Sequence, residues 1–150
     1  MPLDWALASL HHLAIFTLAA IIAFELALTA CAVDDTAIAR LARIDAWYGV
    51  AAAVVVLVGA ARVVFGAKGS AYYMANAFFW TKMGLFVAVG LLSIPPTLRY
   101  LAWRRRLRAD PSFRPDAAAL RSVRRTLWAE VALFTGIPVA AAAMARGYGM

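Results

Sequence analysis

The residues best suited to chemistry in this chain are two adjacent histidines, His11 and His12, which are its only imidazoles. An imidazole can ligate a metal or exchange a proton near neutral pH. Glu25 follows His11 by 14 residues, and about 100° per helical residue brings the two side chains within about 40° of each other, on one stripe with Leu18 and Ile22. His12 lies about 140° from Glu25. This pattern predicts that His11 faces a helix bundle, whereas His12 faces a neighbour or lipid head groups.

The environment of these residues is predicted to be a membrane. Apolar residues make up 65% of the 150-residue chain, and its mean hydropathy is +0.76, whereas soluble domains contain about 45–50% apolar residues. Four apolar stretches have the length of a membrane span: residues 5–32, 46–65, 78–98 and 127–145. None alternates polar and apolar residues as a barrel strand does. We therefore predict an all-α fold, an integral membrane four-helix bundle that forms a single domain over residues 1–150.

Positive charge is concentrated between the third and fourth stretches. Residues 99–126 hold nine arginines and two aspartates, a balance of +7 that equals the net charge of the chain. Loops rich in Lys and Arg stay in the cytoplasm, so we predict that both termini are periplasmic, in a bacterial inner (cytoplasmic) membrane. The remaining acids and bases cancel, which favours membrane lipids and not nucleic acid as partners.

Ionisable residues within or next to the stretches form two layers, and such residues often mark functional sites. The outer layer is cationic and comprises His11, His12, Arg62, Lys82 and Arg146. Glu25 lies about 21 Å deeper than His11 at about 1.5 Å per residue, and Glu130 enters the fourth stretch from the same inner side. Glu25 is either a protonated, hydrogen-bonded structural carboxyl or a proton- or ion-binding residue. Glu130 is the second candidate proton- or ion-binding residue, and because it lies closer to water and to Arg124, the alternative is that it is simply a paired charge.

The segments around the stretches add further expectations. Asp34, Asp35 and Thr36 supply a helix N-cap, so the second helix is predicted to begin before the membrane. The segment "GAKGSAYYMAN" predicts a loop with tyrosines at the membrane interface. Pro95 and Pro96 predict a kink in the third helix. Small-residue stretches such as "GVAAAVVVLVGAA" predict close helix packing, either inside the bundle or on a homo-oligomer face.

Several segments resemble known families. "LHHLAIFTLAAIIAFELAL" and the region from "ARVVFGAKGS" to "LAWRRR" resemble an uncharacterised bacterial family of predicted four-helix inner-membrane proteins. More distantly, the first-helix histidine and "FWTKMGLF" are similar to HemJ-type protoporphyrinogen oxidases and CopD-like membrane domains. The HemJ-type resemblance implies that His11 or His12 ligates haem b and that Lys82 is required.

Three classes of function follow. The first is a redox-type membrane protein that binds haem b or a quinone-like ligand near its periplasmic side, with Arg62, Tyr73 and Lys82 contacting propionates or a quinone head group. Adjacent histidines point about 100° apart and cannot both ligate one iron, so His11 is the predicted metal ligand. The second class is a small proton- or ion-coupled transporter or channel subunit that uses Glu25, and the third is an assembly or scaffold protein without catalysis.

Overall fold

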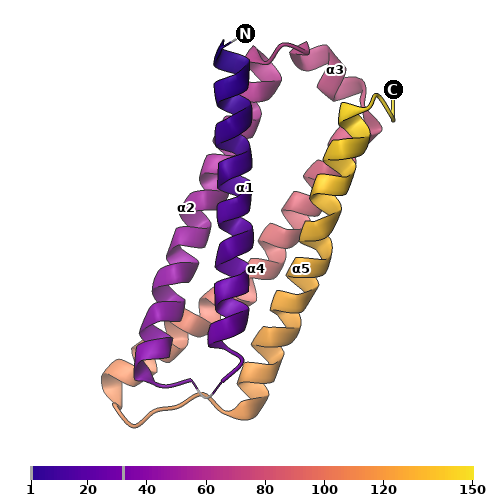
Figure 1. Cartoon of the computed structure of the whole chain (residues 1–150). Coiled ribbons are helices and arrows are strands. Elements are labelled where there is room, and N and C mark those ends of the chain that lie inside the picture. Colours follow the sequence, from indigo (N-terminus) through magenta and orange to yellow (C-terminus); the bar gives the residue numbers. More distant parts are fainter. Residues whose placement is uncertain (1, 32) are drawn as a thin grey trace.

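The computed structural model describes residues 2–31 and 33–150, and every regular element in these ranges is an α-helix. The helices are α1 (Pro2–Leu28), α2 (Asp35–Phe65), α3 (Gly69–Ala75), α4 (Ala77–Ala109) and α5 (Ala117–Ala145). All except α3 are long and apolar enough to cross a membrane. The predicted all-α class is therefore confirmed, and four of the helices are candidate membrane spans (Figure 1).

The ends of α1 and α2 are set by local hydrogen bonds. Helix α1 ends at Leu28, earlier than the predicted residue 32, and Ala32 itself lies outside the described residues. Helix α2 begins before its apolar stretch, as predicted, because the Asp34 carboxylate accepts from the Ala37 N–H at 2.7 Å. That bond, together with the one from the Thr36 hydroxyl, lowers the pKa of the exposed Asp34 carboxyl.

The segment between α2 and α4 is not the simple loop that its glycines predict. Gly69, which has a φ of 73°, is the first residue of the seven-residue helix α3. Asn76 ends α3 and caps α4, because its Oδ1 accepts from the N–H groups of Phe78 and Phe79 at 2.9 and 3.3 Å. Its Nδ2 donates to the Tyr148 carbonyl oxygen at 2.9 Å. Contacts with the C-terminal residues thus hold α3 in place. Because these contacts join residues far apart in the sequence, the local sequence pattern does not predict them.

The prolines do not interrupt the helices that contain them. Helix α4 continues through Pro95 and Pro96 to Ala109, and α5 continues through Pro138. Each proline removes one backbone donor, while the surrounding turns keep their helical hydrogen bonds.

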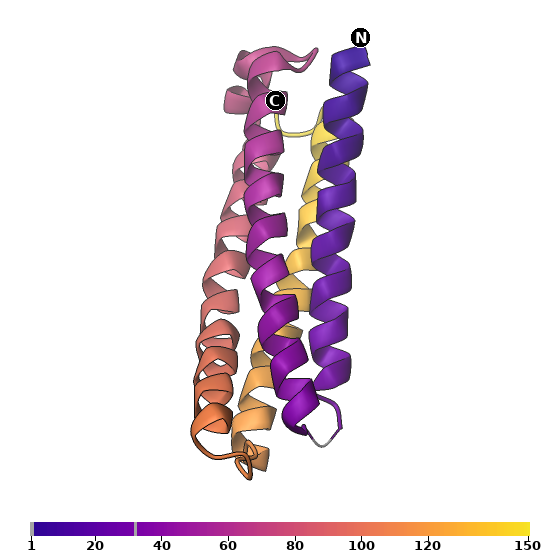
Figure 2. The ribbon, with the colours of Figure 1, turned by 90° about the vertical axis from the view of Figure 1, so that its left-hand side faces the viewer.

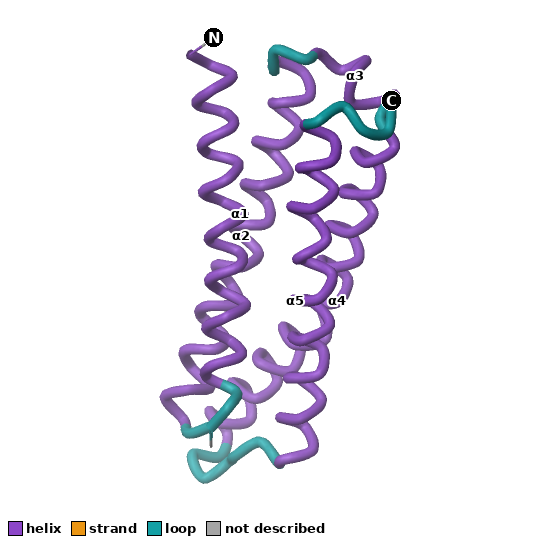
Figure 3. Tube along the Cα trace, turned by 45° about the vertical axis from the view of Figure 1, so that its right-hand side comes forward, coloured by secondary structure: helices purple, strands orange, loops and turns teal. Residues whose placement is uncertain are grey.

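The four long helices form an antiparallel bundle of two hairpins. Helix α1 packs mainly on α2, and α4 mainly on α5 (Figures 1 and 3). Both termini lie at one end of the bundle, here called the terminal end, and the α4–α5 connection lies at the other, here called the arginine end (Figures 1 and 2). Placement of the terminal end in the periplasm stays a prediction.

The surface of the bundle is apolar over much of its length. Large side chains such as Leu13, Phe16 and Leu57 are 64–70% exposed, which suits contact with lipid tails. Exposed tryptophans occupy two levels, with Trp5 and Trp80 towards the terminal end and Trp47 and Trp128 towards the arginine end. Tryptophan favours the two membrane–water interfaces, so these levels indicate where the bilayer surfaces lie.

Packing is densest towards the arginine end. One core cluster there joins α2, α4 and α5 through Leu41, Tyr100 and Leu127, each of which is fully buried. A second cluster further along the bundle joins α1 and α2 through residues that include Leu18, Ile22 and Val55. Beyond it, towards the terminal end, the two hairpins enclose a cavity.

Candidate functional site

The cavity near the terminal end has a volume of about 370 Å³, within the range of small-molecule sites. Four long helices and α3 contribute to its lining. Four residues predicted to bind a cofactor line it together: His11, Arg62, Tyr73 and Lys82. We call this space the histidine cavity. Aromatic and aliphatic side chains, including Phe79, Phe86, Phe134 and Ile137, complete its walls.

His11 is the bundle-facing imidazole, as its helical stripe predicts. Its side chain is buried, on the same face as Leu18, Ile22 and Glu25. His12 is exposed, and its Nδ1 lies 2.7 Å from the Ala8 carbonyl oxygen, so it donates within its own helix. His12 does not line the histidine cavity, which separates the two histidines that the sequence presents side by side.

Gly59 allows His11 to lie against α2. A Cβ atom at this glycine would meet the His11 Cε1 at 3.2 Å, which is tighter than an ordinary contact. The expected hydrogen bond from His11 to Asp4, Arg62 or a tyrosine is absent from the described residues, since the buried His11 Nδ1 has no partner there. Asp4 instead accepts from the Ala67 N–H at 3.2 Å.

Two cationic side chains reach the same cavity from opposite hairpins. Arg62 comes from α2, and its buried Nε has no hydrogen-bond partner among the described residues. Lys82 comes from the first turns of α4, with its Nζ 5.5 Å from the centre of the Phe79 ring. Arg146, the remaining cation of the predicted outer layer, is exposed and is not part of the lining. The cavity therefore combines hydrogen-bond donors with an apolar interior.

The metal chemistry available here is limited to one imidazole. Within residues 2–31 and 33–150, no group of three His, Cys, Asp or Glu side chains is placed to hold a metal ion. Met74 and Met83 line the histidine cavity with His11, and a thioether is a known second ligand to haem iron. These residues fit a haem with one histidine ligand, and they do not fit a haem held by two histidines of this chain.

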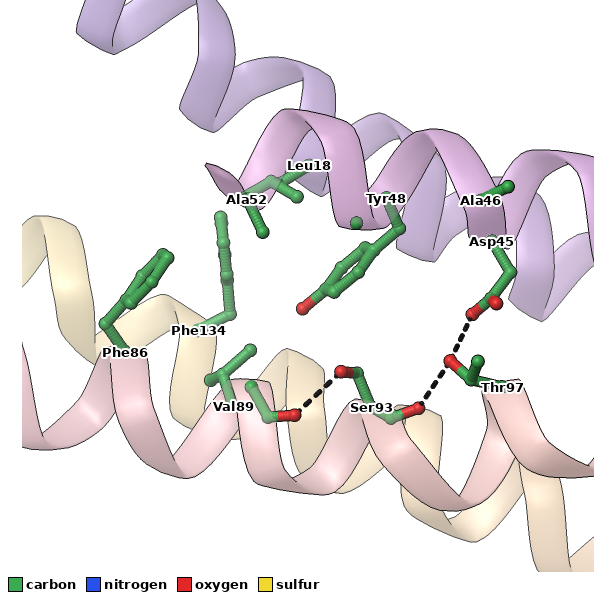
Figure 4. Close-up of a pocket in the computed structure, with 12 residues that line it drawn as sticks. Leu18, Asp45, Ala46, Tyr48, Ala52, Phe86, Val89, Ser93, Thr97 and Phe134 are labelled. Atoms are coloured by element: carbon green, nitrogen blue, oxygen red, sulfur yellow. Dashed lines mark hydrogen bonds between the residues drawn. The ribbon is translucent and has the colours of Figure 1, made fainter. Parts of the chain in front are cut away.

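A second cavity of about 380 Å³ lies between the two hairpins, nearer the arginine end. Figure 4 shows its polar residues, Asp45 and Tyr48 on α2 and Ser93 and Thr97 on α4. The Thr97 hydroxyl donates to the Asp45 carboxylate at 2.7 Å. We call this space the aspartate cavity. Phe86 and Phe134 line both cavities and so mark the boundary between them.

Two further carboxyl groups, on α1 and α5, are buried and do not line the aspartate cavity. Glu25 is 4% exposed and accepts from the Tyr100 hydroxyl at 3.4 Å, while its Oε1 has no partner among the described residues. Glu130 is 1% exposed, and its Oε1 also lacks a described partner. The alternative in which Glu130 is paired with Arg124 finds no hydrogen bond among the described residues, and the Arg124 Nη1 donates to the Leu26 carbonyl oxygen at 3.0 Å.

The sequence did not single out Asp45, Tyr48 or Tyr100 as site residues. Asp45 and Tyr48 stand three residues apart, so they share a helix face, and this spacing is a signal that could have been used. Tyr100 follows the proline pair and precedes the arginine cluster. Nothing in that local pattern shows that it is buried against α1.

These features define a four-span, all-helical membrane protein with two cavities between its hairpins. The model of the family described as "Predicted membrane protein (DUF2214)" matches residues 3–149, and the chain belongs to this family. No curated protein and no solved structure matches the chain. The similarity to HemJ-type and CopD-like proteins gains no support from these comparisons.

Proposed function

We propose that the protein binds a lipid-soluble molecule with a hydrogen-bond-accepting head group in the histidine cavity, and that a quinone is the class that suits it best. The observation that carries the proposal is the convergence of His11, Arg62 and Lys82 on one apolar cavity. Quinones present carbonyl oxygens on an apolar ring, which matches donors set in an aromatic and aliphatic wall.

The energetics favour such a ligand. An unpaired buried donor costs about 1–3 kcal/mol, and both the His11 Nδ1 and the Arg62 Nε are buried without a described partner. A ligand oxygen that accepts from either group would offset this cost. Protonation of His11 on Nδ1 makes that atom a donor, and the Lys82 ammonium adds a charge-assisted one.

Access for an apolar ligand is available from the lipid side. Val56, Val64 and Met74 line the histidine cavity and are also exposed on the bundle surface. A molecule dissolved in the bilayer can therefore reach the cavity laterally, beside α2 and α3. The proposed location is the bacterial inner membrane, where quinone-like molecules would meet the cavity on the periplasmic side.

A titration with a short-chain quinone tests the proposal. The purified protein in detergent should bind the quinone saturably, as measured by calorimetry. His11→Ala and Lys82→Met should each weaken binding by about 10-fold or more, since a hydrogen bond to a charged group contributes about 1.5–3 kcal/mol and 1.4 kcal/mol corresponds to tenfold. His12→Ala is the matched control and should bind as the parent does. Equal affinity in all four proteins would refute the proposal.

Haem b is the second candidate, favoured because the buried His11 and the Met83 thioether both line the histidine cavity. A bound haem would supply a redox-active iron, which His11 would ligate, while Arg62 and Lys82 would pair with its propionates. An absorbance spectrum of freshly purified protein distinguishes it from the quinone. A Soret band that is lost in His11→Ala and kept in His12→Ala would favour haem. A parent protein without a Soret band would exclude haem and keep the quinone as the candidate ligand.

Proton or ion transport through Glu25 and a scaffold role without catalysis are the remaining alternatives. The unpaired Glu25 Oε1 supports the first, and flux in proteoliposomes that is lost in Glu25→Gln would demonstrate it. A scaffold would bind no quinone or haem and would purify with a stable partner.

A further inference from the structure

The aspartate cavity contains one charged side chain among aromatic rings. Asp45 is the only charged residue among the described residues that line it, and both Asp45 and Tyr48 are 7% exposed. Tyr48, Phe86 and Phe134 supply three rings to the same lining. Two cationic side chains line the histidine cavity instead. The aspartate cavity is therefore suited to a ligand of different chemistry.

The carboxylate lies at one end of the aspartate cavity and the phenylalanine rings lie at the other. The Thr97 hydroxyl donates to the Asp45 carboxylate at 2.7 Å, which joins α2 to α4 at the first end (Figure 4). Tyr48 follows on α2, between this pair and the rings of Phe86 and Phe134 (Figure 4). A ligand in this cavity would therefore meet a carboxylate at one end and aromatic rings along its length.

The Asp45 carboxylate has no cationic partner in this lining. No Lys, Arg or His is among the described residues that line the cavity, and the Thr97 hydroxyl supplies the one hydrogen bond described for the carboxylate. A buried carboxylate is costly unless a positive charge pairs with it. Aromatic faces also attract cations, and they recognise quaternary ammonium groups in particular. A carboxylate and aromatic rings around one apolar space therefore favour an organic cation as the ligand.

An opening between α2 and α4 leads from this cavity to the lipid. Ala46, Gly49 and Gly90 line the cavity and are exposed, and a Cβ at either glycine would meet nothing within 4 Å. Both glycines lie within the apolar stretches of their helices, so the opening faces the bilayer. Asp45 stands two residues from the exposed Trp47, which places the carboxylate near a membrane–water interface. An amphipathic cation keeps its charge at that level and its apolar part among the lipid tails, so it can enter from the side.

We propose that the aspartate cavity binds an amphipathic organic cation of the quaternary ammonium class, taken up from the lipid phase. The Asp45 carboxylate pairs with the positive charge, and the rings of Tyr48, Phe86 and Phe134 surround the apolar groups of the ligand. The cavity volume of about 380 Å³ lies within the range of small-molecule sites. This site stands independently of what the histidine cavity binds.

Calorimetry with benzyltrimethylammonium tests the site, using the purified protein in a nonionic detergent. The parent protein should bind this cation saturably. Neopentylbenzene has the same shape without the charge, and as a competitor it should bind at least about 10-fold more weakly, since it cannot pair with the carboxylate. Asp45→Asn should weaken binding of the cation by about 10-fold or more for the same reason. Asp35→Asn, which changes an exposed aspartate in the first turn of α2, is the matched control and should bind as the parent does.

The aromatic part of the site is tested at Tyr48. Tyr48→Phe keeps the ring and should bind the cation as the parent does. Tyr48→Leu should weaken binding by about 3-fold, because a cation–π contact is lost. Equal affinities in these two variants would overturn the role of the ring.

The remaining outcomes decide whether the site exists and separate it from the histidine cavity. A lack of saturable binding, equal affinities for the cation and its neutral isostere, or an unchanged affinity in Asp45→Asn would each overturn the proposal. If Asp45→Asn fails to fold, the comparison of the cation with its isostere in the parent protein still decides. His11→Ala should leave binding of the cation unchanged even where it abolishes quinone binding, so the two proposals can fail separately.

Discussion

The two ends of the bundle differ in how closely the two hairpins pack against each other. Towards the arginine end, α2, α4 and α5 close around Tyr100 and Leu127, and the carboxyl groups beside them are sealed among apolar side chains. Towards the terminal end the hairpins stay apart, and His11, Arg62 and Lys82 line an accessible cavity. The two ends therefore differ in the room that they offer: the buried carboxyl groups are enclosed by side chains, whereas the cationic groups border a cavity.

The two ends differ in how side chains fill the space between the hairpins. At the arginine end large rings fill the space between hairpins, and Tyr100 and Trp103 pack with ring centres 5.8 Å apart. At the terminal end Gly59 on α2 faces His11, and the surrounding side chains enclose the histidine cavity without filling it. The hairpins are thus joined at one end and separated at the other, where α3 and the C-terminal residues bridge the gap through Tyr72 and Asn76.

The largest expected effect is topological, and it decides which end faces which compartment. A reporter fused after Met150 should behave as periplasmic, and one inserted near Ser112 should behave as cytoplasmic, because the arginine-rich connection stays inside. Activity of an alkaline phosphatase and fluorescence of a green fluorescent protein at each site measure this. The reverse pattern would place the histidine cavity on the cytoplasmic side.

The stability of the sealed end should respond strongly to its own residues. Glu130→Leu removes an unpaired buried carboxyl, and we expect it to raise the free energy of unfolding by about 1–3 kcal/mol. Leu127→Ala, on the same helix and fully buried, should lower it by about 2–5 kcal/mol. Melting in detergent compares both variants with the parent protein. A destabilised Glu130→Leu would show that the carboxyl is satisfied by partners other than those described.

Sequence periodicity predicted the histidine side of this comparison well. The stripe of His11, Leu18, Ile22 and Glu25 is buried as predicted, because helix geometry alone fixes which residues share a face. Arg62, Tyr73 and Lys82 also meet His11 at one cavity, since Arg62 and Lys82 lie near the ends of their spans and Tyr73 lies in the connection between those ends. Whether they bind a ligand there stays a prediction.

The carboxyl side was only partly predictable. Glu25 and Glu130 stand out because charged residues are rare within spans, but Asp45 lies at the edge of its apolar stretch and Tyr100 beyond the end of its own. A helix that faces lipid is apolar on all sides, so its sequence does not reveal which side turns inward. Helix α3 was missed for a similar reason, since the Asn76 and Tyr148 contact that ends it comes from residues 72 apart.

A smaller effect on stability should distinguish Gly49 from Gly59, two glycines of α2 that look equivalent in sequence. Replacing Gly by Ala in a helix stabilises by about 0.5–1 kcal/mol where there is room. Gly49→Ala should show this gain, because its Cβ would meet nothing within 4 Å, whereas Gly59→Ala should lose it against the His11 Cε1 at 3.2 Å.

A double-mutant cycle isolates the His11 contact. In the His11→Ala background, Gly59→Ala should regain the stabilisation seen at Gly49, as measured by melting in detergent. Equal gains at both glycines in the parent protein would mean that the His11 ring does not lie against α2.

The smallest effect concerns an exposed carboxyl at the arginine end, in contrast with the sealed ones. Hydrogen bonds from the Ala37 N–H and then the Thr36 hydroxyl lower the pKa of Asp34 in the folded protein. The stability that this cap contributes is therefore present above the unfolded pKa of aspartate and is lost as the pH falls through the lower folded pKa. Asn also caps helices but does not titrate, so the Asp34→Asn protein should lose less stability on acidification than the parent does.

Melting of the parent and variant across an acidic pH series measures the two slopes, and the Asp35→Asn protein serves as the control. Parallel slopes in the parent and Asp34→Asn would mean that this cap does not contribute to the acid sensitivity of the fold, which would then come from the buried carboxyl groups.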